Sequence, residues 1–283
     1  MIFSLNVEGY TRNKLYLSET IRKYLPKIIF LQETWLPYFS ESTLRSDYPD
    51  YHFQISCDDM FEHAEDRLRT HDHVWHGTAV AWHRDLQSST KPLKVVHERF
   101  SAIKILCGTM SILAMSVYLP TSGKDDEYSE CLSLLSTFIE ENCDPGDSIL
   151  IGADTNCSEK SSQRRIRLYR DFCKKQDLLR AGSSSPTFHH YNLTSESNID
   201  TFLISSDLED ELGSIQVNCT MDEPLNFSCH DLLLTTLSIP VPHPEQSSKY
   251  SDTYTVHDRA KVLWDCSDIS SYQEHAGNPI KTC

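Results

Sequence analysis

The feature that most constrains this chain is a set of short apolar runs, each ending at a polar residue. Residues 2–6 (IFSLN), 28–32 (IIFLQ) and 148–154 (SILIGAD) are runs of this kind, and their compactness is typical of buried strands. A helical pattern lies between the first two runs, at residues 13–25, and Pro26 ends it. Its apolar stripe is irregular and consists of Leu15, Leu17, Ile21 and Leu25. The chain is therefore expected to begin with a βαβ unit whose two strands are parallel.

The rest of the chain continues this mixture of strand and helix patterns. Further strands are expected at residues 77–82, 92–97, 101–106 and 110–119, and later at about 199–204, 215–219 and 231–238; helices are expected at 125–142 and 163–176. The polar stretch 57–76 indicates a surface insertion, and residues 240–283 lack a periodic apolar face, which indicates a linker-like, poorly structured tail. We therefore predict one α+β domain over residues 1–239.

Composition limits where such a chain acts. Hydrophobic residues make up 39% of 283, which is enough for one large core. No apolar run is long enough to cross a bilayer, and the N-terminus lacks the basic and apolar regions of a signal peptide. We expect an intracellular protein, nuclear or cytoplasmic, that acts as a monomer away from membranes. The ten scattered cysteines include no CxxC pair, so reduced thiols are expected.

Charge argues against strong non-specific binding of nucleic acid, because the net charge is −15 and such binding depends on lysine and arginine. It does not exclude a nuclease, since clustered carboxylates that hold a cation can accept a phosphate. The helix expected at 163–176 is basic; a solvated face is favoured over contact with a DNA backbone. The histidines at 71–76 offer no helical i,i+4 pair, so zinc is disfavoured there.

The most informative pattern is where polar side chains stand relative to strands. Some follow an expected strand and others precede one: Asn6, Glu33, Tyr118, Asp154 and Asn156 come at or after strand ends, and Asp200 and His230 come before strands. If the late strands run opposite to the early ones, all of these groups meet at one edge of the sheet. Carboxylates, amides and one imidazole gathered there would form a hard-cation site with a base beside it.

The same residues lie in segments that resemble the endonuclease/exonuclease/phosphatase superfamily. The matching segments follow the family's order: SLNVEG at 4–9, IIFLQET at 28–34, SVYLP at 116–120, ILIGADTN at 149–156, SNIDTFLIS at 197–205 and SCHDLLL at 228–234. Within the superfamily the chain looks closest to the apurinic-type endonuclease domain of non-LTR retrotransposons. The segment KVLWDCSDISSYQE at 261–274 also resembles the connector that follows such domains, so a fragment of a polyprotein, a decayed copy and a derived host gene all stay open.

This resemblance implies a four-layered α/β sandwich like that of deoxyribonuclease I, with two packed mixed sheets flanked by helices. It also implies Mg²⁺ or Mn²⁺ and a DNA substrate. Glu33 would be the principal metal ligand with Asn6 beside it, and Asp154 and Asn156 would orient the attacking water or assist the leaving group. Tyr118 would contact the scissile phosphate. Asp200 would hold His230 in the useful tautomer, and His230 would contact the phosphate or remove a proton there.

Three positions depart from the family pattern. Cys229 stands before His230 where an Asp is common, Glu8 stands where an Asn or Asp is usual, and Thr155 replaces a common aromatic. Asp231, on the other side of His230, is expected to face the opposite strand surface.

Three functions remain open on the sequence. The presence of all six matching segments in the family's order favours a DNA endonuclease. A phosphodiesterase or phosphatase acting on a lipid or small phosphate ester would use the same fold. A catalytically inactive relic or binding module is favoured by Cys229 and by the net acidity.

Overall fold

The structure is a computed structural model that describes residues 1–37, 40–57, 76–95, 97–108, 110–183, 185–192, 194–218 and 224–238. The predicted insertion at 57–76, except for its two end residues, and the predicted tail at 240–283 lie outside the described residues. The domain boundary predicted at residue 239 also lies outside them and stays a prediction.

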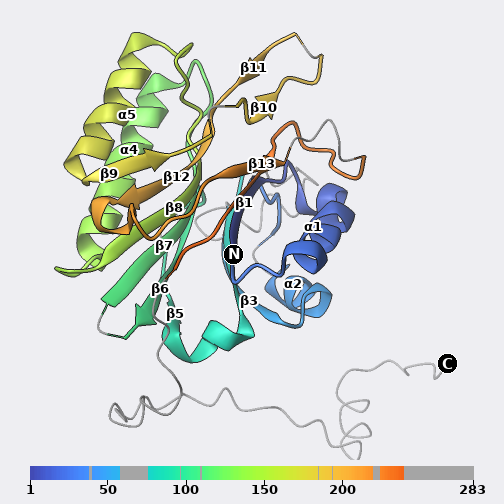
Figure 1. Cartoon of the computed structure of the whole chain (residues 1–283). Helices are drawn as coiled ribbons and strands as arrows, with labels where there is room; N and C mark the ends of the chain where they lie inside the picture. The colour runs from blue at the N-terminus through green and yellow to red at the C-terminus, as the bar shows by residue number, and fades with distance from the viewer. Residues whose placement is uncertain are drawn as a thin grey trace, which may run out of the picture. The chain divides into compact units, whose positions relative to one another are not determined.

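Two six-stranded sheets form the centre of the fold (Figure 1). The first has the order β13 (Gln216–Asn218), β14 (Leu232–Thr235), β1 (Ile2–Asn6), β2 (Ile28–Gln32), β4 (Thr78–His83) and β3 (Tyr51–Ser56). The second has the order β5 (Thr90–Pro92), β6 (Phe100–Cys107), β7 (Met110–Tyr118), β8 (Ser148–Asp154), β12 (Asp200–Ser205) and β9 (Leu178–Ala181).

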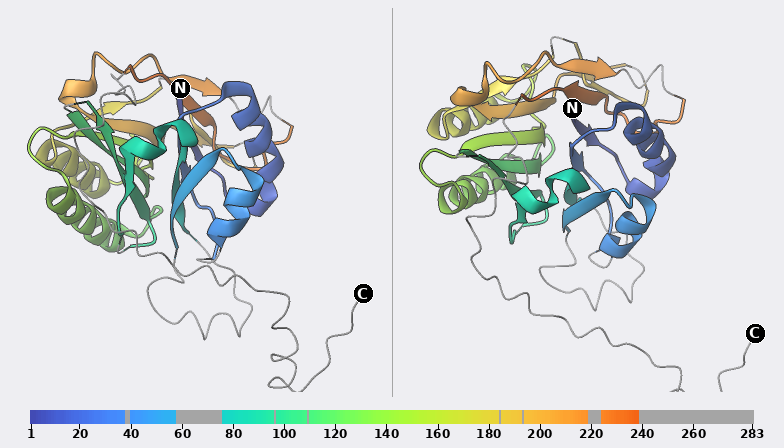
Figure 2. Two further views of the ribbon diagram at one scale, coloured as in Figure 1. Left: turned by 90° about the horizontal axis from the view of Figure 1, so that it is seen from below. Right: turned by 60° about the horizontal axis from the view of Figure 1, so that its bottom comes forward.

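The two sheets pack face to face, and helices cover their outer faces (Figure 2). Phe30 and Val80 from the first sheet pack with Ile103, Leu150 and Phe202 from the second in one buried apolar cluster. Helices α1 (Tyr10–Tyr24) and α2 (Glu41–Asp47) pack on the first sheet, and α4 (Asp125–Asn142) and α5 (Gln163–Lys175) pack on the second. The expected four-layered sandwich is therefore confirmed.

Most of the expected elements are present, with some differences at their ends. β1 and β2 pair in parallel, as the βαβ pattern predicts. Helix α1 begins three residues earlier than expected, and two leucines of its predicted apolar stripe point outward, since Leu15 and Leu25 are exposed. The strand predicted at 92–97 is wrong: β5 covers Thr90–Pro92, and after one more hydrogen bond, from the Leu93 N–H to the Ala102 carbonyl at 3.1 Å, the described residues up to 97 lie outside any strand.

A small hairpin, formed by β10 (Phe188–His189) and β11 (Glu196–Ser197), stands apart from both sheets and projects from the same end of the sandwich as the site described below (Figure 1). Two short 3₁₀ helices complete the described elements, η3 (Arg84–Ser89) and η4 (Ser206–Leu208). Within the described part of the chain, no helix has the length and apolarity needed to cross a membrane. The cysteines of this part are free thiols, as expected.

Candidate active site

The directions of four strands bring the expected residues to one edge between the sheets. β12 runs antiparallel to β8, so that Asp200 lies directly opposite Asp154. β14 runs antiparallel to β1, which returns His230 to the end of β1 where Asn6 lies. Just below this edge the buried amide of Gln32 ties the sheets together: its Nε2 donates to Ser116 Oγ (3.0 Å) and to the Gly152 carbonyl (3.1 Å).

Two carboxylates form the acidic centre of this edge, and Asn6 joins them. The Asn6 amide Nδ2 donates to Glu33 Oε1 and to Asp154 Oδ2, each at 2.9 Å. Ligand atoms of Glu33, Asp154 and His230 all lie within 4.8 Å of one another. Hard oxygen donors at this spacing, with Asp154 almost fully buried, fit a hard divalent cation such as Mg²⁺.

The orientation of the Asn6 amide is fixed by its other end. Asn6 Oδ1 accepts the backbone N–H of Glu8 at 3.0 Å, so reversing the amide would set donor against donor and oxygen against two carboxylates. Asn6 therefore holds the two carboxylates in place. The metal-ligand role expected for Asn6 would require its amide to rotate.

Backbone strain is concentrated at this edge. Glu8, Glu33 and Asn156 all have a φ in the left-handed region, at 40°, 50° and 46°, which costs about 1–3 kcal/mol for each residue other than glycine. The strained backbone at Glu33 follows immediately on β2, and Trp35 Nε1 donates to Glu33 Oε2 at 3.2 Å. The fold therefore retains unfavourable conformations that aim these side chains into the site.

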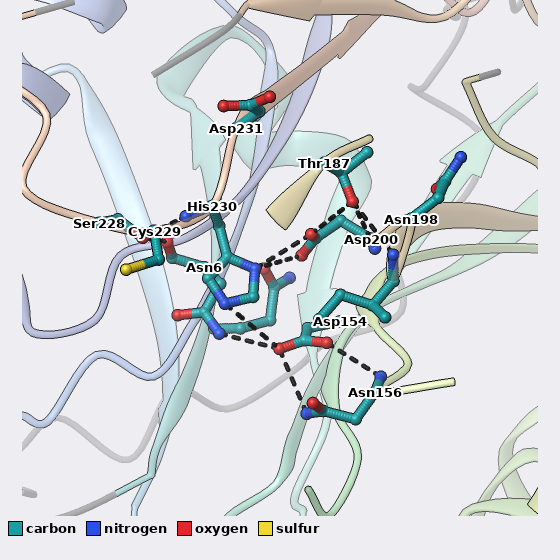
Figure 3. A network of polar contacts seen from close by, with 12 residues as sticks. Asn6, Asp154, Asn156, Thr187, Asn198, Asp200, Ser228, Cys229, His230 and Asp231 are labelled. Carbon is teal, nitrogen blue, oxygen red and sulfur yellow. Dashed lines mark hydrogen bonds and ion pairs between the residues drawn. The ribbon is translucent and has the colours of Figure 1, made fainter. Parts of the chain in front are cut away.

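His230 and Asp200 form a buried pair beside the acidic centre (Figure 3). His230 Nδ1 lies 3.0 Å from the Asp200 carboxylate, and Nε2 lies 3.9 Å from Asp154 Oδ2. The Asp200 carboxylate accepts from Nδ1 and leaves Nε2 facing the site. The hydroxyl of buried Thr187 donates to Asp200 Oδ2 at 2.8 Å. Sequence reasoning missed Thr187, because a threonine that precedes a two-residue strand carries no periodic signal.

The charges of this group shift two pKa values upward. Burial raises the pKa of Asp154 to about 7, and the Asp200 carboxylate adds to this shift. Burial alone would lower the pKa of His230, but the nearby carboxylates, above all Asp200, outweigh it and raise that pKa to about 10. At neutral pH His230 is thus a cation among carboxylates, suited to contacting an anionic oxygen.

Asn156 lies on the other side of Asp154. Its backbone N–H donates to Asp154 Oδ1 at 3.0 Å, and its amide Nδ2 donates to the Leu119 carbonyl at 2.8 Å. The buried guanidinium of Arg165 holds the Asn156 carbonyl at 3.1 Å. Arg165 corrects one expectation, because the basic residues of α5 do not all face solvent. Arg165 is only 1% exposed, whereas Arg167 is exposed.

Tyr118 also borders the site, and it lies beside two residues that sequence reasoning did not select, Arg99 and His76. The Arg99 guanidinium lies 5.0 Å from the centre of the Tyr118 ring, and the His76 ring lies 5.8 Å from it. Burial, with the nearby Glu33 and Asp154 charges, raises the pKa of Tyr118, so its hydroxyl stays protonated. Within the described residues, Arg99 Nη1 is buried and has no hydrogen-bond partner.

The departures from the family pattern are accommodated around His230. The Cys229 side chain points away from Asp154 (Figure 3), and its backbone N–H donates to Glu8 Oε2 at 2.8 Å. Asp231 faces the opposite surface, as the strand alternation predicts, and its Oδ2 lies 2.9 Å from His189 Nε2. The centre therefore lacks a carboxylate directly before His230, and the Glu8 carboxylate accepts a hydrogen bond from the Cys229 backbone N–H.

Comparison with known proteins agrees with this fold. The chain matches no curated protein. It is similar to an AP endonuclease from Archaeoglobus fulgidus, with 15% identity, a TM-score of 0.64 and coverage of 84% of this chain and 98% of that one. The endonuclease domain of TRAS1, a telomere-specific non-LTR retrotransposon, gives 14% identity, a TM-score of 0.61 and coverage of 84% and 98%.

A 3'-5' exonuclease from Neisseria meningitidis gives 14% identity, a TM-score of 0.63 and coverage of 84% of this chain and 99% of that one. At these identities the likeness shows the fold. A family model adds the sequence evidence, because it matches residues 3–220, which carry Asn6, Glu33, Asp154 and Asp200. The chain belongs to the Endonuclease/Exonuclease/phosphatase family.

Proposed function

We propose that this chain is a divalent-cation-dependent phosphodiesterase that acts on DNA as an endonuclease. The observation that carries the proposal is the acidic centre: Glu33 and Asp154 are bridged by Asn6 at 2.9 Å on each side, and His230 is held against them by Asp200. A cation bound there would offset negative charge on the phosphoryl oxygens. Glu33 and Asp154 would hold it, with Asn6 beside them.

The side chains around that centre supply the other requirements of phosphodiester hydrolysis. Asp154 and Asn156 would orient the attacking water or assist the leaving oxygen, since they already share a hydrogen bond. His230, protonated at neutral pH because its pKa is about 10, would donate a hydrogen bond from its Nε2–H to a phosphoryl oxygen. The Tyr118 hydroxyl and the Arg99 guanidinium would contact the phosphate from the other side.

DNA is proposed as the substrate for two reasons. Proteins with similar folds include an AP endonuclease and a retrotransposon endonuclease domain. The segment at 261–274 also resembles the connector of retrotransposon endonucleases, which supports a retrotransposon origin. The net charge of −15 predicts that binding of DNA is weak, because affinity for the DNA backbone depends on lysine and arginine that neutralise phosphates.

A second candidate is a catalytically inactive relic of the same fold. It is favoured by Cys229, which leaves no carboxylate directly before His230, and by Glu8, whose Oε2 is bound to the Cys229 amide instead.

The test is a substrate panel in Mg²⁺ or Mn²⁺, with supercoiled plasmid and a lipid phosphodiester. Parent protein is compared with Glu33→Ala, His230→Ala and two controls outside the acidic centre, Glu211→Ala at an exposed position and His190→Ala at a half-buried one. We expect the parent and both controls to nick plasmid, and Glu33→Ala and His230→Ala to be inactive. Equal nicking by all variants would refute the proposal. Cleavage of the lipid alone would assign the lipid alternative, and no cleavage of either substrate would favour the relic.

A further inference from the structure

His230 lies outside the regular ladders of both sheets, although the proposed function depends on its position. β14 begins two residues later, at Leu232. The backbone N–H of His230 donates to Ser228 Oγ at 3.1 Å, and its carbonyl accepts from Asn226 Nδ2 at 3.2 Å. The sheet therefore does not by itself fix the position of the His230 backbone.

The hairpin strand β10 fixes it from the other side. His189 N–H donates to the Cys229 carbonyl at 2.8 Å, and Asp231 N–H donates to the Thr187 carbonyl at 2.7 Å. These two bonds flank His230, which forms a bridge with Phe188, and the Phe188 ring lies 4.9 Å from the His230 ring, edge to face. The hairpin and the segment 229–231 are thus one small antiparallel unit.

A second His–Asp pair joins the two halves of this unit on the face away from the site. His189 Nε2 lies 2.9 Å from Asp231 Oδ2, and the Asp231 side chain is only 1% exposed. A carboxylate buried to this degree is unfavourable unless it is paired and hydrogen-bonded. Asp231 is therefore stabilised when the hairpin is in place and its His189 imidazole is within reach.

The same hairpin also reaches the partner of His230. Thr187, which immediately precedes β10, is fully buried, and its hydroxyl donates to Asp200 Oδ2 at 2.8 Å and accepts the backbone N–H of Asp200 at 3.0 Å. Displacing β10 would loosen both the His230 backbone and the Asp200 carboxylate that orients the ring.

We propose that the His189–Asp231 pair is a positioning latch that locks the β10–β11 hairpin onto segment 229–231 and thereby holds His230 over Asp154. The inference rests on the proposed function for its catalytic consequence and on the geometry for the latch itself. The two residues do not touch the reacting atoms; they act through the backbone on either side of His230 and through Thr187.

The test compares Asp231→Ala, His189→Ala and the double variant with parent protein; His190→Ala, a neighbouring hairpin histidine whose Nδ1 lies 2.6 Å from Asn192 Oδ1, is the control. If Asp231→Ala does not fold, Asp231→Asn replaces it. Backbone amide exchange is the first readout. We expect the amides of residues 189 and 231 to exchange at least tenfold faster in the latch variants, with those of β14 unchanged, and no change in His190→Ala.

Cleavage kinetics are the second readout. Each single variant is expected to lower kcat at least tenfold with KM within about threefold, a loss of the size seen when groups that orient catalytic ligands are removed. The double variant should be no worse than the poorer single variant. Unchanged exchange, unchanged kcat, or losses that multiply in the double variant would each overturn the latch. If the parent cleaves no phosphodiester, the proposed function fails, and amide exchange alone decides whether the latch exists.

Discussion

Arg165 offers the sharpest test of how the fold supports the site. Its guanidinium donates to the carbonyls of Pro120 (2.6 Å), Thr121 (2.7 Å) and Asn156 (3.1 Å), and its Nε donates to Asp125 Oδ1 at 2.9 Å. It therefore joins the loop after β7 to the loop after β8, which carries Asn156. We predict that Arg165→Met, which keeps much of the side-chain volume, destabilises the protein strongly.

The size of the loss follows from burial. Removing one partner of a buried ion pair costs about 3–5 kcal/mol, and a lost hydrogen bond to a charged group costs about 1.5–3 kcal/mol. These losses do not add, and Asp125 regains water because its side chain is 21% exposed. A loss of about 3–5 kcal/mol in the free energy of unfolding is the result, which lowers Tm on the order of 10 °C in a domain of this size.

Urea denaturation followed by circular dichroism measures this loss, with Arg167→Met as the matched control because Arg167 is exposed on the same helix. The control is expected to change the free energy of unfolding by less than about 0.5 kcal/mol. If Arg165→Met and Arg167→Met lie within about 1 kcal/mol of each other, the account of Arg165 as a buried anchor is wrong.

Three further predictions concern packing, pH and substrate contact. Gly152→Ala should cost about 1–3 kcal/mol in a thermal melt, because the added Cβ would lie 2.6 Å from the Phe30 side chain; an unchanged Tm would show that the sheets can separate freely there. Burial raises the pKa of Asp154 to about 7, so below pH 7 its carboxyl must lose a proton before it binds a cation. The apparent Mn²⁺ affinity measured by calorimetry should therefore rise about tenfold per pH unit below pH 7 and level off above it. An affinity that does not change with pH would contradict this. Arg99→Met should raise KM for DNA at least fivefold and reduce its salt dependence, because Arg99 Nη1 has no hydrogen-bond partner among the described residues; unchanged kinetics would remove Arg99 from the site.

The part of this site that follows from sequence is the part governed by strand periodicity. The boundaries predicted for residues 125–142 and 148–154 are those of α4 and β8, because a long amphipathic stripe favours a helix and a short apolar run bounded by turn residues favours a buried strand. Asn6, Glu33, Asp154, Asp200 and His230 meet as expected, because a polar residue before a strand and one after a strand share an edge only when the strands are antiparallel, as β8 and β12 are.

The contacts that hold the site together depend on tertiary structure, and no periodic pattern in the sequence indicates them. Sequence shows that Arg165 is charged, but its burial depends on carbonyls 9 to 45 residues away. The hairpin strands β10 and β11 are two residues long, too short for any periodicity, so Thr187 and His189 could not be linked to His230. Leu15 was predicted to face the core and is 59% exposed, because the preference of one leucine does not decide which face of a helix is buried.

Direct binding of Mn²⁺ tests the central claim, that Glu33 and Asp154 form a divalent-cation site beside His230. Electron paramagnetic resonance counts free Mn²⁺ during titration of the parent, Glu33→Gln, Asp154→Asn and the exposed control Glu211→Gln. We expect the parent and the control to bind Mn²⁺ alike, and each site variant to bind it at least tenfold more weakly. Binding by Glu33→Gln that equals binding by the parent would show that Glu33 is not a ligand of the cation.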